Sequence, residues 1–300
     1  MIEVSQLTKY YGDYAAIRDV TFQVGRQQIV GFLGPNGAGK STTMRILAGF
    51  LTASSGKAIV AGHDVLTDPL AARASIGYMP ENCPLYPEMR VAEYLDFRAG
   101  LKGMHGADGR KRVEAAMERC WLSDVRRQLI CTLSKGYRQR VGLAQAIIHD
   151  PEVLILDEPT TGLDPNQLVE IRELIRSIGK EKTVILSTHI MQEVEAICDR
   201  VIIISKGQIV ADDTAKILQQ DLQHQTVYVE FDNKVSAAQL KKIPNVSKVE
   251  GLNNGWLIES LSNTDLRKEV AQYAQAQDWL ILTLNIEQKT LEEVFKELTK

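Results

Sequence analysis

The chain has 300 residues, 44% of them hydrophobic, and a formal net charge of -3. This length suits one large domain with a smaller one, and the apolar content supports a hydrophobic core rather than disorder. The small net charge, without long runs of one sign, argues against a dedicated nucleic-acid-binding protein.

The four cysteines are scattered without a C-x-x-C pair, so we do not expect them to bind zinc. We expect instead that they are reduced thiols in a cytosolic setting. Residues 1–4 do not begin a signal peptide. The longest apolar runs, such as 153–156 and 201–204, are too short to cross a bilayer. We therefore expect a soluble chain, and any membrane span would have to come from another protein.

The first 60 or so residues alternate short β-like runs with turns at glycines. The runs predicted as strands are 21–24, 29–33 and 57–61. Residues 41–49 are predicted as a helix that ends at Gly49. A strand, a glycine-rich loop and a helix therefore follow one another here.

The glycine-rich loop matches the phosphate-binding pattern G-x-x-x-x-G-K-[ST] at every fixed position. Glycines allow backbone conformations that a Cβ would block, so successive N–H groups can surround an anion. Lys40 can reach the outer phosphates, the Ser41 hydroxyl can bind Mg²⁺, and the following helix presents its positive end. A plain glycine-rich turn is the alternative, but the strand–loop–helix context favours a nucleoside triphosphate site. The predicted phosphate-binding residues are Gly34, Pro35, Asn36, Gly37, Ala38, Gly39, Lys40, Ser41 and Thr42.

Helices replace strands between about residue 85 and residue 150. Residues 91–98 and 112–121 carry apolar residues at helical spacing, and a polar, glycine-containing break over 101–109 separates them. A further helix over 141–149 ends before the pair Asp150-Pro151. This region is therefore predicted as a helical insertion.

Strands and helices alternate again from residue 152. The predicted strands are 153–156, 183–187 and 201–205, and the predicted helices are 168–178 and 191–198. This order predicts a parallel-sheet α/β core. The first of these strands delivers Asp157 and Glu158 at its carboxyl end, where open α/β sheets bind ligands. Asp157 suits a Mg²⁺ shell together with Ser41, and Glu158 can polarise an attacking water.

A glutamine-rich stretch at 219–225 predicts a boundary between a domain over 1–220 and a domain over 221–300. The strands predicted beyond it are 226–231, a hairpin over 247–260 and 279–285, and the helices are 237–242, 265–276 and 290–298. The resulting order β-α-β-β-α-β predicts a small α+β, ferredoxin-like domain. We find no catalytic cluster in this domain.

Residues 133–140, which read LSKGYRQR, come about 17 residues before the acidic pair. Here the chain resembles the ATP-binding-cassette (ABC) ATPases, whose signature reads LSGGQ at this place. The resemblance covers about the first 220 residues and implies a P-loop NTPase core of the ABC type. It also implies ATP and Mg²⁺ as ligands, Tyr11 as the residue that stacks on adenine, and His189 as the switch histidine. Its catalytic residues would be Lys40, Glu158 and His189.

The resemblance also implies a dimer with two composite sites, made with a second copy or a related cassette. Ser134 is a plausible N-cap of the helix that follows it, and that helix presents free N–H groups. In this family the helix end meets the γ-phosphate held by the other subunit, so Ser134 and Gly136 are predicted to bind nucleotide. The loop 162–164 matches the family's coupling loop between the two sites.

The chain departs from the family pattern in two places. Lys135 and Tyr137 replace a glycine and a glutamine of the signature. Glu81 stands where the family has glutamine, and a carboxylate is also a hard oxygen ligand, so we expect Glu81 to contribute to the metal site. The apolar loop 84–87 that follows is interpreted either as a groove for a partner's coupling helix or as ordinary packing of the insertion.

Residues 133–204 look most like the ATP-binding subunit of the gliding-motility-associated ABC transporters of Bacteroidetes, and residues 290–295 look like the tail of exporter-type cassettes. The resemblance implies a cytoplasmic ATPase, peripheral on the inner face of the cell membrane, that drives a separate integral membrane permease. The rival hypothesis is a soluble ABC ATPase acting on nucleic acid or ribosomes. Such relatives usually carry tandem cassettes, coiled coils or zinc fingers, and none is evident here, so no nucleic-acid partner is expected. A regulator that uses ATP only as a clamp is a third hypothesis.

Overall fold

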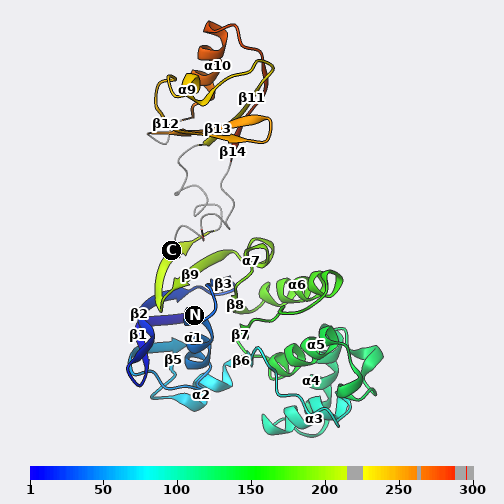
Figure 1. Cartoon of the computed structure of the whole chain (residues 1–300). Helices are drawn as coiled ribbons and strands as arrows, with labels where there is room; N and C mark the ends of the chain where they lie inside the picture. The colour runs from blue at the N-terminus through cyan, green and yellow to red at the C-terminus, as the bar shows by residue number, and fades with distance from the viewer. Residues whose placement is uncertain (215–225, 262–264, 288–294, 296–300) are drawn as a thin grey trace. The chain divides into compact units, whose positions relative to one another are not determined.

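The computed structural model of the chain describes residues 1–214, 226–261, 265–287 and 295 (Figure 1). Its contacts divide the chain into two compact units at residue 215. Each unit has hydrophobic core residues of its own.

The larger unit is built around a six-stranded sheet in the order β10-β9-β3-β8-β7-β6. All neighbouring strands run parallel except β10, which pairs antiparallel with β9 at the edge. These strands are β3 (Ile29–Leu33), β6 (Ile76–Met79), β7 (Val153–Asp157), β8 (Thr183–Thr188), β9 (Arg200–Ser205) and β10 (Gln208–Asp213). The predicted parallel α/β core is confirmed, and β6 and β10 are two strands that the prediction did not include.

Strand β7 shows why the core strands read as continuous apolar runs. All five of its residues are buried. Val153 and Ile155 pack into the hydrophobic cluster on one face of the sheet, and Leu154 and Leu156 pack into the cluster on the other. Side chains alternate between the faces of a strand, so a sheet covered on both faces needs apolar residues at every position.

A second, antiparallel sheet in the order β2-β1-β4-β5 covers one side of this core. Its strands are β1 (Ile2–Tyr11), β2 (Tyr14–Val24), β4 (Ser55–Val60) and β5 (His63–Asp64). Helix α1 (Lys40–Leu47) shares the cluster formed by both sheets through buried Met44 and Leu47. The prediction of short β-like runs was too limited here, because it missed β1 and began β2 seven residues late.

Three helices form the insertion, α3 (Val91–Leu101), α4 (Gly106–Arg119) and α5 (Lys135–Ile147), and they lie together in Figure 1. They share a core with α6 (Pro165–Gly179) and with one face of the central sheet. Helix α4 begins inside the predicted break. Helix α5 begins at Lys135 rather than at residue 141, and the Ser134 hydroxyl accepts a hydrogen bond from the Tyr137 N–H at 3.3 Å. Ser134 is therefore the N-cap of α5, as predicted.

The smaller unit is an antiparallel sheet in the order β12-β13-β11-β14 with two helices. The elements are β11 (Thr226–Phe231), α9 (Ala237–Leu240), β12 (Val246–Leu252), β13 (Gly255–Ser260), α10 (Arg267–Ala276) and β14 (Ile281–Glu287). This chain order and sheet order confirm the predicted ferredoxin-like fold. The boundary stretch 219–225 and, apart from residue 295, the helix predicted over 290–298 lie outside the described residues.

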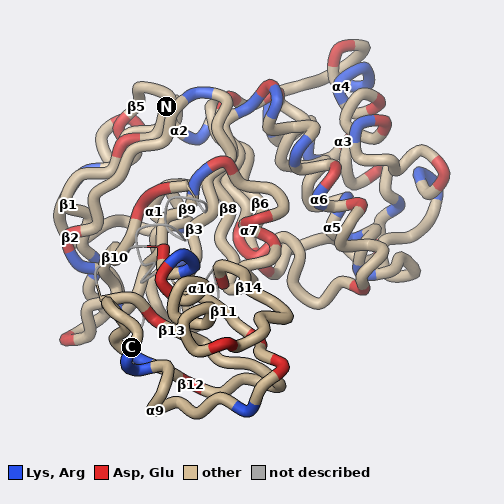
Figure 2. The backbone as a smooth tube through the Cα atoms, turned by 90° about the horizontal axis from the view of Figure 1, so that it is seen from above, with Lys and Arg blue, Asp and Glu red and all other residues tan. Residues whose placement is uncertain are grey.

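Charged residues of both signs are interspersed along the backbone, as Figure 2 shows. Among the helices in the described part of the chain, none is long and apolar enough to span a bilayer.

Candidate nucleotide-binding site

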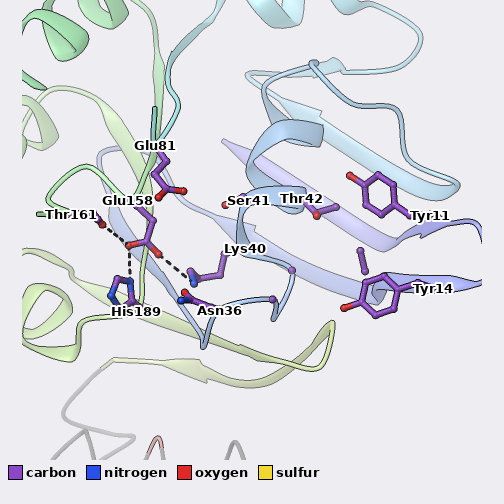
Figure 3. Close-up of a pocket in the computed structure, with 13 residues that line it drawn as sticks. Tyr11, Tyr14, Asn36, Lys40, Ser41, Thr42, Glu81, Glu158, Thr161 and His189 are labelled. Carbon is purple, nitrogen blue, oxygen red and sulfur yellow. Dashed lines mark hydrogen bonds and ion pairs between the residues drawn. The ribbon is translucent and has the colours of Figure 1, made fainter. Parts of the chain in front are cut away.

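A cavity of about 450 Å³ lies where the segments after β3, β7 and β8 meet at the carboxyl edge of the central sheet (Figure 3). Ligand sites in open α/β sheets form at this edge because the loops there diverge. The cavity is lined by Tyr11, Tyr14, Ala16, Asn36, Gly37, Gly39, Lys40, Ser41, Thr42, Glu81, Glu158, Thr161 and His189.

The backbone conformation of the glycine-rich loop from Gly34 to Lys40 requires a glycine at position 39. Gly39 has φ +108°, and a Cβ there would lie 2.7 Å from the Ala16 carbonyl oxygen and 2.5 Å from a methyl carbon of Ile17. Both the backbone angle and the close approach require glycine. With Gly39 in this conformation, α1 starts at the next residue and its first N–H groups remain free for an anion.

The side chain of Lys40 folds back onto the glycine-rich loop, of which Lys40 is the last residue. Its ammonium donates to the carbonyl oxygen of Gly34 at 2.9 Å and to that of Pro35 at 3.3 Å. Lys40 is only 6% exposed, and its Nζ lies 3.3 Å from a carboxylate oxygen of Glu158. A buried charge of this kind must be paired, and the ion pair with Glu158 supplies the partner.

Glu158 contacts Lys40, Thr161 and His189 at one end of the cavity. Its Oε2 lies 2.8 Å from His189 Nδ1 and accepts a hydrogen bond from the Thr161 hydroxyl at 3.1 Å. With Glu158 ionised, Nδ1 of a neutral His189 carries the proton and Nε2 is left as an acceptor. The dashed lines in Figure 3 mark these contacts together with the ion pair to Lys40.

Asp157 lies beneath the cavity rather than in its lining and is 1% exposed. Its Oδ1 accepts hydrogen bonds from the hydroxyls of Ser41 at 3.0 Å and Ser187 at 2.6 Å. A carboxylate and a hydroxyl in contact are oxygen donors of the kind that Mg²⁺ takes alongside phosphate and water. Glu81, on the segment after β6, is a further carboxyl group, and it lies in the lining of the cavity.

Two tyrosines lie at the opposite end of the cavity from Glu158 (Figure 3). Tyr11 and Tyr14 are partners at the end of the β1–β2 hairpin and are 47% and 61% exposed. Exposed aromatic faces of this kind can stack on a planar base. The prediction named Tyr11 but missed Tyr14, although the hairpin turn at Gly12 was the signal that could have paired them.

Most of the predicted site residues meet in this cavity. Ala16 and Thr161 are lining residues that the prediction missed, and Thr161 could have been found from its place just before the loop 162–164. The predicted residues that do not line the cavity are Gly34, Pro35, Ala38, Asp157, Ser134 and Gly136. The last two lie in the first turn of α5, where a Cβ on Gly136 would come within 3.0 Å of the Gln167 side chain.

The loop 84–87 has two different surroundings. Pro84 lines a second cavity of about 490 Å³ together with residues that include Tyr78, Arg98 and His149. Tyr86 instead packs edge-on against the ring of Phe97, with ring centroids 5.5 Å apart. One part of the loop therefore faces a cavity and another part packs on α3.

A glycine-rich phosphate loop, its lysine and a carboxylate pair at the edge of a parallel sheet define a P-loop protein of the nucleoside triphosphate-binding class. A family model described as ABC transporter matches residues 17–161. The chain is 30% identical over its full length to the "Linearmycin resistance ATP-binding protein LnrL" of Bacillus subtilis (strain 168), of which it covers 98%. The chain therefore belongs to the family of ABC transporter ATP-binding proteins.

Two further comparisons agree with this assignment. The chain is 39% identical over 215 residues to the "Probable multidrug ABC transporter ATP-binding protein YbhF" of Escherichia coli (strain K12). That match covers 71% of this chain but only 37% of the relative's length. The solved dimeric structure of MJ0796, a bacterial ABC transporter cassette, aligns with a TM-score of 0.64 and 25% identity, over 71% of this chain and 98% of the other.

Proposed function

We propose that this chain is the ATP-binding subunit of an exporter-type ABC transporter, which hydrolyses ATP and drives a separate membrane permease from the inner face of the membrane. The observation that carries the proposal is the contact of Glu158 with both Lys40 and His189 beside the Ser41–Asp157 pair. The resistance function in the name of LnrL supports export as the direction of transport.

Each side chain of the cavity has a task in this proposal. Lys40 and the N–H groups of the glycine loop hold the phosphates. Glu158 accepts a proton from the attacking water, and His189 orients Glu158 through its Nδ1–H. Ser41 and Asp157, with Glu81 nearby, would hold Mg²⁺, which would neutralise charge on the phosphates.

The proposal includes a head-to-tail dimer of two cassettes. Ser134 and Gly136 lie outside the cavity of their own chain, at the N-terminus of α5, where Ser134 is exposed and Gly136 is buried. An N-terminus of this kind attracts anions, so in the dimer it would face the nucleotide bound by the other copy. The dimeric form described for MJ0796 supports this arrangement.

The proposed function also includes a membrane permease as partner and a cellular process. We place the permease contact at the second cavity, which Pro84 lines. We also propose an association with gliding motility, which rests on the likeness of residues 133–204 to gliding-motility-associated cassettes.

A soluble ABC ATPase that acts on nucleic acid or ribosomes is the less supported alternative. Detergent extracts should yield a hydrophobic partner with this chain, and stimulation of hydrolysis by RNA or DNA would favour the alternative.

The role of Glu158 gives the direct test. Glu158→Gln keeps the size of the side chain but removes the base, so turnover of ATP should fall by roughly 10²- to 10⁴-fold. Phosphate release from purified wild type and variant measures the effect, and binding of a fluorescent ATP analogue serves as the control for nucleotide affinity. Turnover near that of wild type would show that Glu158 is not the base.

A further inference from the structure

The segment that carries His189 contains a carboxyl group that packing alone does not explain. Glu193 lies in α7 (Met191–Ile197) and is 0% exposed. Its Oε2 accepts a hydrogen bond from the Thr188 hydroxyl at 2.7 Å, whereas its Oε1 has no hydrogen-bond partner among the described residues. Burial of a carboxyl group with so few partners costs free energy that an apolar side chain would avoid.

Thr188 connects this carboxyl group to two parts of the nucleotide site, the segment that carries His189 and the phosphate loop. Its hydroxyl oxygen accepts from the Ile190 N–H at 3.1 Å while its hydrogen points to Glu193. Its carbonyl oxygen accepts from the N–H of Gly34, the first residue of the phosphate loop, at 3.4 Å. Thr188 therefore binds the residue that follows His189 and the loop that contains Lys40.

Glu193 fixes the direction of the Thr188 hydroxyl. The hydroxyl donates to Glu193 Oε2 and accepts from the Ile190 N–H, so it has a partner on each side. An apolar residue in place of Glu193 would remove the acceptor and leave the Ile190 N–H as the one of these two partners that orients the hydroxyl. The backbone on both sides of His189 is thereby held in one position, and the His189 ring is held 2.8 Å from Glu158.

We propose that Glu193 is a positioning residue that acts through Thr188 to hold His189 against Glu158. The inference rests on the proposed ATPase function and adds to it a buried group that does not line the cavity. Glu193→Leu should lower kcat about tenfold, the effect of losing the orientation given by one hydrogen bond, and leave the KM for ATP within about twofold. Glu193→Gln keeps an acceptor oxygen and should retain most of the activity.

A double-mutant cycle with His189→Ala tests the coupling. If Glu193 acts through His189, Glu193→Leu should lower the residual kcat of His189→Ala less than twofold. The same tenfold loss in both backgrounds would overturn the proposal. Thr188→Val should reproduce the loss and Thr188→Ser should retain activity, and this pair carries the test if Glu193→Leu does not fold. Glu195→Leu, on the exposed side of the same helix, is the matched control.

The NMR signal of His189 tests the positioning role of Glu193 without a measurement of ATP hydrolysis. The chain has five histidines, so the ring signal of His189 can be assigned in a histidine-labelled sample by its loss in His189→Ala. Glu193→Leu should shift or broaden that NMR signal and leave the other four unchanged. An unchanged His189 signal would contradict the positioning role even if the wild type hydrolyses ATP. A wild type without hydrolysis but with the signal change would refute the ATPase function alone.

Discussion

Buried charge at the site is organised around one carboxylate. Glu158 is 6% exposed and meets Lys40, His189 and the Thr161 hydroxyl. Its backbone has φ +51°, an uncommon angle for a residue with a side chain, at the point where β7 ends. Strain of this kind is retained where surrounding contacts fix it, and here the Glu158 N–H donates to the Ser187 hydroxyl at 3.0 Å.

Glu81 gives a prediction about the metal. In our proposal it lies close enough to Mg²⁺ to change its affinity, so Glu81→Gln should shift the Mg²⁺ concentration that gives half-maximal ATPase activity. The removal of a negative charge should raise that concentration, because carboxylates bind Mg²⁺ better than amides do. Titration of Mg²⁺ at fixed ATP measures the shift. Superimposable titration curves for the two proteins would contradict a metal role for Glu81.

His149 gives a prediction about pH and stability. Burial, assisted by the positive charge of Lys102, lowers the pKa of His149 to about 4, and its Nε2 lies 3.0 Å from the Ile76 carbonyl oxygen. In the unfolded chain a histidine titrates near its ordinary value of about 6.5. Between these values the unfolded chain binds more protons, so the contribution of neutral His149 is complete above pH 6.5 and is lost as pH falls toward 4.

We therefore expect His149→Gln to flatten the loss of stability between pH 6.5 and pH 4. Urea unfolding at several pH values measures the slope, and His105→Gln at an exposed position is the matched control. Equal slopes for His149→Gln and wild type would show that His149 titrates normally in the folded chain.

At the scale of elements, the strands and helices with strong apolar patterns were predictable from the sequence. Strand β7 is one example, because all of its residues are buried and apolar except for the terminal Asp157. Strand β1 was missed, because its partners shift register at several points and its exposed positions break the alternation. Strand β6 has only four residues and includes Gly77, so its membership in the sheet depends on pairing with β7, which no local pattern reveals.

The same reasoning applies to the site. The phosphate loop is one continuous stretch of sequence, and the acidic pair is another. The residues of each could therefore be named in advance. Tyr14 and Thr161 were missed, although each lies beside a feature that the sequence shows, because whether they line the cavity depends on how a hairpin and a loop turn toward it. The start of α5 was misplaced by six residues, since glycine and lysine in the signature carry no apolar periodicity.

Helix α5 gives a prediction at the scale of one element. Ser134→Ala removes the hydroxyl that caps α5 and should lower the free energy of unfolding by about 1 kcal/mol. Ser134→Asp should retain the cap and the stability, because aspartate is an equally good N-cap. In the proposed dimer its charge would meet the γ-phosphate of the other copy, so ATPase activity should fall sharply. A stable Ser134→Asp variant with full activity would contradict the composite site.

At the scale of the whole molecule, the chain combines an ABC-type P-loop unit with a ferredoxin-like unit, each with core residues of its own. The cavity of the larger unit is lined by Lys40, Glu158 and His189, to which our proposal assigns phosphate binding and the activation of water. The signature helix N-terminus lies outside it, and the proposed dimer would complete each site with that helix from the other copy.

The central claim is that ATP joins two copies of this chain, and light scattering on Glu158→Gln with Mg–ATP tests it most directly. Because hydrolysis is blocked in this variant, we expect twice the mass of one chain with Mg–ATP and the mass of one chain without nucleotide. Adding Lys40→Ala to the same variant should abolish the dimer, since the phosphates lose their charged ligand. A Glu158→Gln chain that retains Mg–ATP and stays monomeric would contradict the account.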